Sequence, residues 1–393
     1  MTPDKGCKQN CDQVSSQPAK SLYVHVPFCL AKCRYCDFYS IRLQGGLAGA
    51  FVAAAAKELT SRLQALDPPL GSVFLGGGTP TVLGGQLLGS LLAEIRPLID
   101  GRVEFTIEAN PGTIEPAVVE AMVQGGVNRV SIGVQSFDGQ ELSLLGRIHT
   151  PRQAQEAVGT VKAAGIENLS LDLIYGIPGQ TMDSWRASVS RALELGIEHL
   201  SCYALSIEEG TELHRLRESG QVQEMNESLQ KECYYAAIEL ARSGGLEHYE
   251  ISNFARPGRQ CRHNLTYWHN EPYIGIGPGA ASYLGGLRQT NRRDLNAYLA
   301  ALGSGQSPPA EDECLSGRPS MAETIMLGLR LIQGLDKSRF ISRYGQDAAE
   351  AFPNSIGRYA VMGVLIVTPS HIRLSTPAIF VADSVLADIL AEA

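Results

Sequence analysis

Basic residues and long apolar runs are both scarce in this sequence, and each scarcity excludes a class of protein. The chain has 33 Lys and Arg against 41 Asp and Glu, for a formal net charge of −8. Nucleic-acid-binding proteins usually carry a basic surface, so we expect no nucleic-acid partner. Apolar runs such as residues 359–367 are far shorter than the roughly 20 residues of a membrane-spanning helix. We therefore expect no transmembrane segment, while peripheral association with a membrane stays open.

A secretory signal is also missing, since no basic segment near the N-terminus leads into an apolar core. Nine cysteines in 393 residues are too few for a disulfide-stapled secreted fold. Both features predict a cytoplasmic protein in a reducing compartment. Residues 1–20 are rich in Lys, Gln, Ser and Asp, and we expect them to form a disordered tail. Cys7 and Cys11 lie in this tail, and their role stays open.

Three other cysteines lie close together after an apolar run. They are Cys29, Cys33 and Cys36, in the stretch YVHVPFCLAKCRYCDF at residues 23–38. An iron–sulfur cluster normally takes four thiolates, so three closely spaced cysteines leave one iron for a ligand that is not protein. A zinc site and a disulfide are the alternatives, but structural zinc favours paired short spacings with a fourth Cys or His. The spacing therefore favours an iron–sulfur cluster.

A strand-and-helix pattern repeats between residues 21 and 206. Short β-branched runs alternate with amphipathic stretches, which predicts successive βα units and a parallel sheet. Strands are predicted at residues 21–26, 72–75, 103–107, 129–134, 168–173 and 199–203. Helices are predicted at residues 47–66, 86–99, 115–125, 138–145, 151–164 and 181–195. These units are too few to close a (βα)8 barrel, so the expected fold class is α/β, a partial, three-quarter (βα)6 barrel.

Glycine and polar residues follow several of the predicted strands. The glycine run 76–78, with Thr79, follows the second strand, where missing side chains would let backbone donors approach a ligand. Glu108, Gln135 and Asp172 lie at the ends of the third, fourth and fifth strands. The carboxyl ends of parallel strands meet at one rim, so these groups and the cysteines should gather there. A tight turn for the glycines and helix caps for the polar residues are the alternatives.

The cysteine loop, with Tyr23 ahead of it and an aromatic residue before the third cysteine, resembles the radical S-adenosylmethionine (SAM) superfamily. More narrowly, it is similar to the oxygen-independent coproporphyrinogen III oxidase group and its HemW branch of haem chaperones. The resemblance implies a 4Fe-4S cluster on Cys29, Cys33 and Cys36, with SAM on the fourth iron, where one electron cleaves it to a 5′-deoxyadenosyl radical. It also implies SAM contacts at Tyr23, Gly77, Gly78, Thr79, Glu108, Gln135, Arg147 and Asp172, with Ser206 as a weaker candidate.

A second stretch resembles the HemW branch. Residues 263–268 read His-Asn-Leu-Thr-Tyr-Trp, which is similar to a haem-binding motif of that branch. The resemblance implies haem as cargo, with His263 as a candidate axial ligand and with flat apolar surface from Tyr267 and Trp268. A buried structural histidine is the alternative. The family pattern would also place a histidine at position 281, where this chain has Ala281, so the second haem ligand stays open.

The remaining composition predicts three regions. After the tail at 1–20, residues 21–290 should form the radical SAM barrel with an extension that carries the His263 motif, including a strand at 247–255. Residues 291–393 should form a small, mostly helical domain with a hairpin at 362–374, because a Ser, Gly and Pro-rich link at 303–309 marks a change in composition. This domain resembles the C-terminal domain of the same group, and we expect it to cover the open barrel or to serve as a docking surface.

Two functions follow from the resemblance. One is a haem chaperone that inserts haem into acceptor proteins, such as respiratory proteins, and takes electrons for its cluster from a donor. The other is an oxygen-independent oxidase that converts coproporphyrinogen III to protoporphyrinogen IX by radical decarboxylation. Oxidases of the group carry a further cysteine two residues past the third ligand, where this chain has Phe38. The sequence therefore favours the chaperone, and it leaves open whether SAM is cleaved in turnover.

Overall fold

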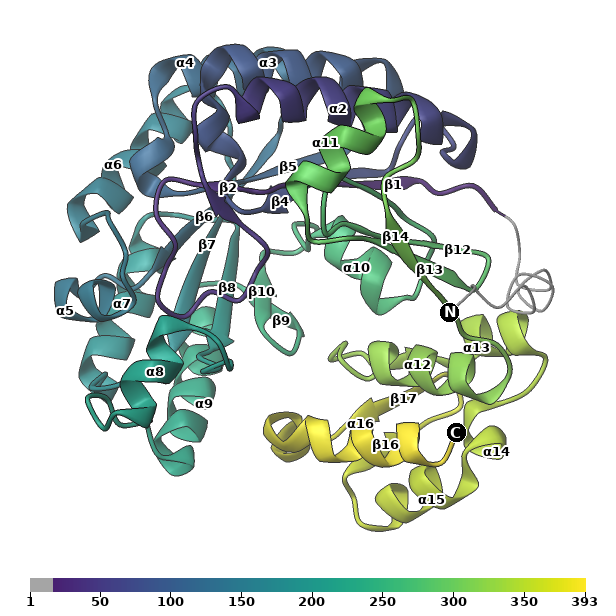
Figure 1. The fold of residues 1–393 in the computed structure, drawn as a ribbon. Helices are drawn as coiled ribbons and strands as arrows, with labels where there is room; N and C mark the ends of the chain where they lie inside the picture. The colour runs from purple at the N-terminus through teal and green to yellow at the C-terminus, as the bar shows by residue number, and fades with distance from the viewer. Residues whose placement is uncertain (1–16) are drawn as a thin grey trace.

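The computed structural model describes residues 17–393 and is drawn as a ribbon in Figure 1. Most of the predicted tail, with Cys7 and Cys11, lies outside the described residues. Within the tail, Ala19 is buried and forms a parallel bridge with Leu66. Between residues 17 and 393, no helix is both long and apolar enough to cross a membrane.

A parallel sheet forms the centre of the molecule, and its strands follow one another in chain order (Figure 1). The six strands are β1 (Ser21–Val26), β4 (Ser72–Gly77), β5 (Glu104–Ala109), β6 (Arg129–Gln135), β7 (Asn168–Tyr175) and β8 (His199–Ala204). Helices cover the outer face of the curved sheet; they are α2 (Leu47–Arg62), α3 (Gly84–Ile95), α4 (Pro116–Gly125), α5 (Gly139–Leu144), α6 (Pro151–Ala163) and α7 (Met182–Glu194). The predicted partial (βα)6 barrel is therefore confirmed.

The strands alternate between the helix layer and the inside of the barrel, as a period of two residues requires. In β6, Val130, Ile132 and Val134 are fully buried in the core under the helices. Between them, Ser131 reaches Asp172 across the inside of the barrel. The inner face is thus polar where the outer face is aliphatic, and the inside of the barrel can hold a polar ligand.

The sheet is wider than the sequence predicted. A short strand, β11 (Ile274–Ile276), adds in parallel to β1, and a hairpin of β9 (Glu247–Glu250) and β10 (Asn253–Ala255) adds to β8. The prediction of one strand over 247–255 is wrong, because the chain reverses at residues 251–252 and folds back on itself. The strand β11 was missed because three residues with a central glycine give too little periodicity to detect.

One short helix, α10 (Arg262–Trp268), closes the barrel at the end where the strands begin. The backbone N–H groups of Arg262 and His263 donate to Glu104 Oε1 at 2.7 and 3.3 Å, so a carboxylate satisfies the first turn of the helix. Ser72 Oγ forms a 2.9 Å hydrogen bond with His263 Nδ1. Ser72 and Glu104 are the first residues of β4 and β5, and they fix α10 opposite the rim that carries the cysteines.

The rest of the chain packs beside the open side of the barrel. An antiparallel sheet comprises β12 (Ala281–Leu284), β13 (Leu287–Asn291) and β14 (Ala310–Cys314), and α11 (Leu295–Gly303) packs against α2. The small, mostly helical region contains α12 (Arg318–Gly328), α13 (Lys337–Tyr344), α14 (Ala348–Ala351), α15 (Pro353–Val361), α16 (Ala382–Ala391), β15 (Leu335–Asp336) and the hairpin of β16 (Leu365–Val367) and β17 (His371–Leu374). The boundary at 291 stays a prediction, and β14 pairs with β13 across it.

Candidate functional site

The cysteine loop is anchored at its two ends and near its middle. Two short parallel strands, β2 (Phe28–Cys29) and β3 (Ile41–Arg42), pair where the loop begins and ends. Near the middle of the loop, the backbone N–H of Arg34 donates to the carbonyl of Leu145 at 3.0 Å. The loop therefore lies against the carboxyl ends of the barrel strands, as the sequence predicted.

This loop and the strand ends enclose a cavity of about 370 Å³, which we call the cluster-loop cavity. Its lining contains most of the predicted site residues, namely Cys29, Cys33, Cys36, Gly77, Gly78, Thr79, Glu108, Gln135, Arg147, Asp172 and Ser206. It also contains Asn110, Ser131 and Tyr203, which the sequence analysis did not single out. Ser131 could have been found from the two-residue period of β6, which places it on the inner face.

The three thiols of the cysteine loop line the same cavity. Among residues 17–393, no three His, Cys, Asp or Glu side chains converge closely enough to hold a single metal ion. A four-iron cluster takes each of its thiolates at a separate corner, and Cys29, Cys33 and Cys36 stay its predicted ligands. Arg147 Nη1 donates to Cys33 Sγ at 3.3 Å, and Thr79 Oγ1 lies 3.7 Å from Cys29 Sγ. The Thr79 contact lowers the pKa of the Cys29 thiol, against the effect of burial.

Burial acts against ionisation of the thiols in the metal-free chain. It raises the pKa of the Cys36 thiol to about 11 and raises that of Cys29 as well. Iron must therefore displace these protons when the cluster assembles.

Two carboxylates face the cluster-loop cavity from neighbouring parts of the barrel. Burial, and then the charge of Asp172, raise the pKa of Glu108 to about 8. Burial also raises the pKa of Asp172, although Ser131 Oγ donates to its two oxygens at 3.0 and 3.1 Å. Two carboxylates in one enclosed space favour a positively charged ligand, which would relieve their repulsion.

Arg147 brings a positive charge to the same cavity. Arg147 donates to the carbonyl of Gly133 and to Cys33, while its Nε has no hydrogen-bond partner. Asn110 Oδ1 is also buried at the wall without a partner. The cavity thus offers carboxylates for an ammonium or sulfonium group and a guanidinium for a carboxylate. These are the charged groups of SAM, so the residues present fit that cofactor.

The glycine run owes its composition to packing. A Cβ on Gly78 would lie 2.4 Å from the carbonyl oxygen of Phe28, and one on Gly77 would lie 2.5 Å from the His25 ring. Gly77 also has φ of +100°, which side chains disfavour. Its N–H donates to Glu108 Oε2 at 3.2 Å. These glycines therefore allow close contact with β1 and β2, and their expected role as ligand contacts at the cavity stays a prediction.

Backbone strain occurs at the cluster-loop cavity and at a second cavity on the open side of the barrel. Among the described residues other than glycine, only Gln135 and Asn270 have positive φ, of 68° and 51°. Gln135 lines the cluster-loop cavity, where the pairing of β6 with β7 shifts register. Asn270 lines the second cavity. Such conformations concentrate at binding sites.

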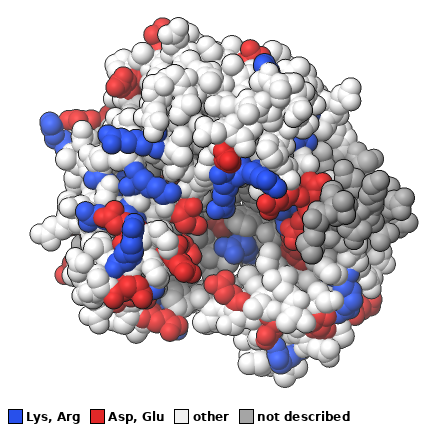
Figure 2. Space-filling view, viewed as in Figure 1, with Lys and Arg blue, Asp and Glu red and all other residues white. Residues whose placement is uncertain are grey.

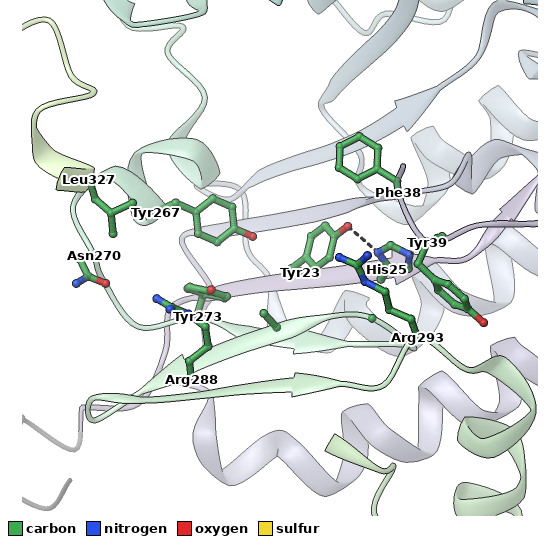
Figure 3. Close-up of a pocket in the computed structure, with 12 residues that line it drawn as sticks. Tyr23, His25, Phe38, Tyr39, Tyr267, Asn270, Tyr273, Arg288, Arg293 and Leu327 are labelled. Atoms are coloured by element: carbon green, nitrogen blue, oxygen red, sulfur yellow. Dashed lines mark hydrogen bonds between the residues drawn. The ribbon is translucent and has the colours of Figure 1, made fainter. Parts of the chain in front are cut away.

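The second cavity, of about 400 Å³, lies on the open side of the barrel, and we call it the aromatic cavity (Figure 3). Its lining includes the rings of Tyr23, His25, Phe38, Tyr39, Tyr267 and Tyr273, with Ala281, Arg288, Arg293 and Leu327. Tyr23, a predicted SAM contact, lies here rather than in the cluster-loop cavity, and its hydroxyl is 3.1 Å from His25 Nδ1. Phe38 lines both cavities.

His263 is not brought to the cysteine loop or to the surface of either cavity. It is 1% exposed, and its two ring nitrogens lie 2.9 Å from Ser72 Oγ and 2.9 Å from Tyr267 Oη. Burial, and then the charge of Arg129, lower the pKa of His263 to about 3, so the ring is neutral. Axial ligation of haem stays a prediction, and it would require His263 to give up one of these hydrogen bonds.

Comparison with known families matches two regions of the chain. The pattern of the radical SAM superfamily matches residues 23–192, and that of the HemN C-terminal domain matches residues 315–381. The sequence is 33% identical over 377 residues to "Heme chaperone HemW" of Bacillus subtilis, which covers 95% of this chain and 100% of that protein. It is 37% identical over 331 residues to the protein of the same name in Lactococcus lactis, covering 84% of this chain and 86% of that protein.

Among solved structures, coproporphyrinogen III oxidase (HemN) from Escherichia coli is similar in fold. The TM-score is 0.82, and the match covers 96% of this chain and 92% of that one. The sequence identity is 21%, so this likeness concerns the fold alone.

Proposed function

Because the chain belongs to the HemW family of radical SAM proteins, we propose that it is a haem chaperone that carries haem beside a 4Fe-4S cluster and SAM. The observation that carries this proposal is the identity of 33% to a HemW protein across 95% of the chain. Such a match extends through the barrel, the His263 motif and the C-terminal region together. Phe38, at the position where the oxidases of the group have a further cysteine, supports the same function.

In this proposal Cys29, Cys33 and Cys36 hold the cluster, and the fourth iron is left for SAM. When bound, the cluster supplies the single electron that reductive cleavage of SAM requires. The side chains of the cluster-loop cavity contribute the charges that bind and orient SAM. Glu108 and Asp172 balance the positive groups of SAM. The guanidinium of Arg147 pairs with the carboxylate of SAM.

Partners and location follow from the same proposal. The chain would receive haem, pass it to an acceptor such as a respiratory protein, and take electrons from a donor protein. It would act in the cytoplasm, with peripheral contact at a membrane where the acceptor lies.

A transfer assay tests the function. The full chain, with its cluster rebuilt under anaerobic conditions, is loaded with haem and mixed with an acceptor protein that lacks haem. We expect the Soret band to move from the chain to the acceptor, and to move more slowly from a Cys36→Ala variant. A parallel incubation with coproporphyrinogen, SAM and a reductant should release no carbon dioxide. Steady release of carbon dioxide, without haem transfer, would establish the oxidase instead.

A further inference from the structure

The aromatic cavity offers the surface and the charge that a flat ring with carboxylate groups needs. Resting on the proposed function, we propose that this cavity is the haem site and that Arg293 pairs there with a carboxylate of the macrocycle. The volume of about 400 Å³ lies in the range of small-molecule sites, roughly 300 to 1,000 Å³. Figure 2 shows a face of the molecule that is hollowed near its centre, with charged side chains around the hollow. Phe38, which lines the cavity, is 64% exposed, so the cavity opens to solvent at this residue.

The rings of the cavity come from separate parts of the chain. Tyr23 and His25 lie side by side on β1, with Tyr267 and Tyr273 at one end of the cavity and Tyr39 at the other (Figure 3). Tyr267 and Tyr273 pack edge to face, with ring centroids 4.7 Å apart. Aromatic pairs favour offset or edge-to-face contact, so such walls suit a large planar ligand.

Arg293 supplies an unpaired cation at this cavity. Within residues 17–393 it makes no hydrogen bond or ion pair, and its guanidinium points toward Tyr23 and His25 in Figure 3. Arg288, on β13, is already matched by Glu323 at 2.6 Å and by Glu313 at 3.1 Å. A free guanidinium beside aromatic faces favours a carboxylate ligand, because a charge-assisted hydrogen bond forms without breaking an existing one.

Hydrogen bonds hold the end of the cavity that carries Tyr267 before any ligand binds. Tyr267 is held by His263, and the side-chain N–H of Asn270 donates to Thr324 Oγ1 of α12 at 2.9 Å. Arg343 Nη1 donates to the carbonyl of Asn270 at 2.7 Å, which fixes that residue in its left-handed conformation. The C-terminal region therefore positions one side of the cavity. Fixing the wall in advance lowers the entropy lost on binding.

The cluster-loop cavity is a poorer match for haem. Glu108 and Asp172 lie at its wall, and they would repel the carboxylates of the macrocycle. Phe38 separates the two cavities, so haem in the aromatic cavity and SAM in the cluster-loop cavity can be bound together. Haem would then lie next to the loop that carries the cluster.

A charge-removal pair tests the role of Arg293. Haem is titrated into the full chain with its cluster rebuilt, and into Arg293→Met and Arg292→Met variants. Arg292 is the matched control, because it is exposed and lies 4.0 Å from Glu311 outside the cavity. We expect Arg293→Met to weaken haem binding about tenfold or more, and Arg292→Met to change it by less than about twofold. Haem with methyl-esterified carboxylates should bind the Arg293→Met variant as tightly as it binds the unmodified chain.

A blocking variant tests the site itself. Ala281 lines the cavity, and Ala281→Trp would fill it without touching the cluster-loop cavity. We expect this variant to lose haem and iron-free protoporphyrin IX alike, with iron content and SAM affinity unchanged. Saturating SAM should leave haem affinity unchanged in the unmodified chain.

The results of these titrations distinguish a failure of the proposed haem site from a failure of the proposed function. A chain that binds no haem would refute the proposed function. Haem binding that survives both Ala281→Trp and Arg293→Met would leave the function in place and overturn this site. An apparent Kd for haem that rises without limit as SAM is added would place haem in the cluster-loop cavity.

Discussion

His263 Nε2 lies 2.9 Å from the hydroxyl of Tyr267, one turn further along α10. The histidine has no cavity surface, whereas the tyrosine ring lines the aromatic cavity. Two residues of one motif therefore have different positions, one in the core and one at the site. In the proposed haem site, the motif contacts haem through the ring of Tyr267, and His263 fixes that ring in place.

We expect the iron–sulfur cluster to depend on three cysteines. Replacing Cys29, Cys33 or Cys36 with alanine should abolish the binding of about four irons per chain, because each thiolate occupies one corner of the cluster. Iron and sulfide analysis after anaerobic reconstitution measures this. Cys233→Ala is the matched control, since Cys233 is buried in the core far from the loop in sequence. Full iron content in Cys29→Ala would refute the assignment.

We expect the affinity for SAM to depend on the carboxylates of Glu108 and Asp172. Asp172→Asn should weaken SAM binding by roughly ten- to a hundredfold, because one charge-assisted contact is worth about 1.5 to 3 kcal/mol. Glu108→Gln should act in the same direction, and both variants should keep the cluster. Asp183→Asn, an exposed change at the start of α7, is the control. Isothermal titration that shows equal affinity in all of these proteins would contradict the cofactor pocket.

The pH dependence of stability tests the buried state of Glu108. Burial raises its pKa from 4.5 to about 8 in the SAM-free protein. Between these values the folded chain keeps a proton that the unfolded chain has lost, so this group lowers the free energy of unfolding as pH rises. Glu108→Gln imitates the protonated form.

The variant should therefore be more stable than the unmodified chain at pH 8, by roughly 1 to 3 kcal/mol, because part of the carboxylate faces the cavity. The difference should vanish near pH 4.5. Urea denaturation at several pH values measures it, with Glu94→Gln on the exposed face of α3 as control. A difference that does not depend on pH would argue against a buried carboxyl.

Much of the barrel could be predicted from the sequence, because its signals are local. Strands such as β6 alternate polar and aliphatic residues, and α6 and α7 begin with capping boxes at Thr150 and Thr181. The gathering of polar residues at one rim of the barrel could be predicted from topology, because the carboxyl ends of parallel strands meet there. Local signals therefore placed Glu108 and Asp172 correctly without any contact information.

The aromatic cavity could not be predicted, because its parts are distant in sequence. Tyr23 on β1, Tyr267 on α10 and Leu327 on α12 meet only when β11 joins β1 and α12 packs beside α10. The two-residue period of a strand also shows which face of the sheet a side chain lies on, but not which cavity it lines. The SAM contact at Tyr23 came from the family resemblance; the residue lines the aromatic cavity, and the contact stays a prediction.

The His263 motif gives the last prediction. His263→Ala removes the partner of Tyr267 Oη and of Ser72 Oγ, so the ring of Tyr267 loses its fixed position. Haem and iron-free protoporphyrin IX should both bind several-fold more weakly, and the Soret band of bound haem should keep its wavelength. Leaving buried polar groups unpaired should also cost about 1 to 3 kcal/mol of stability.

Tyr267→Phe is the matched variant, because it breaks the same hydrogen bond from the other side and keeps the ring. In the double variant the two effects on haem affinity should not add, since either change alone already releases the ring. A histidine that ligated iron would behave differently. It would shift the Soret band when replaced, leave the iron-free porphyrin unaffected and show no coupling to Tyr267→Phe. Absorbance titrations of the four proteins with the two porphyrins therefore distinguish a positioning histidine from an axial ligand, and the buried position of His263 predicts the former.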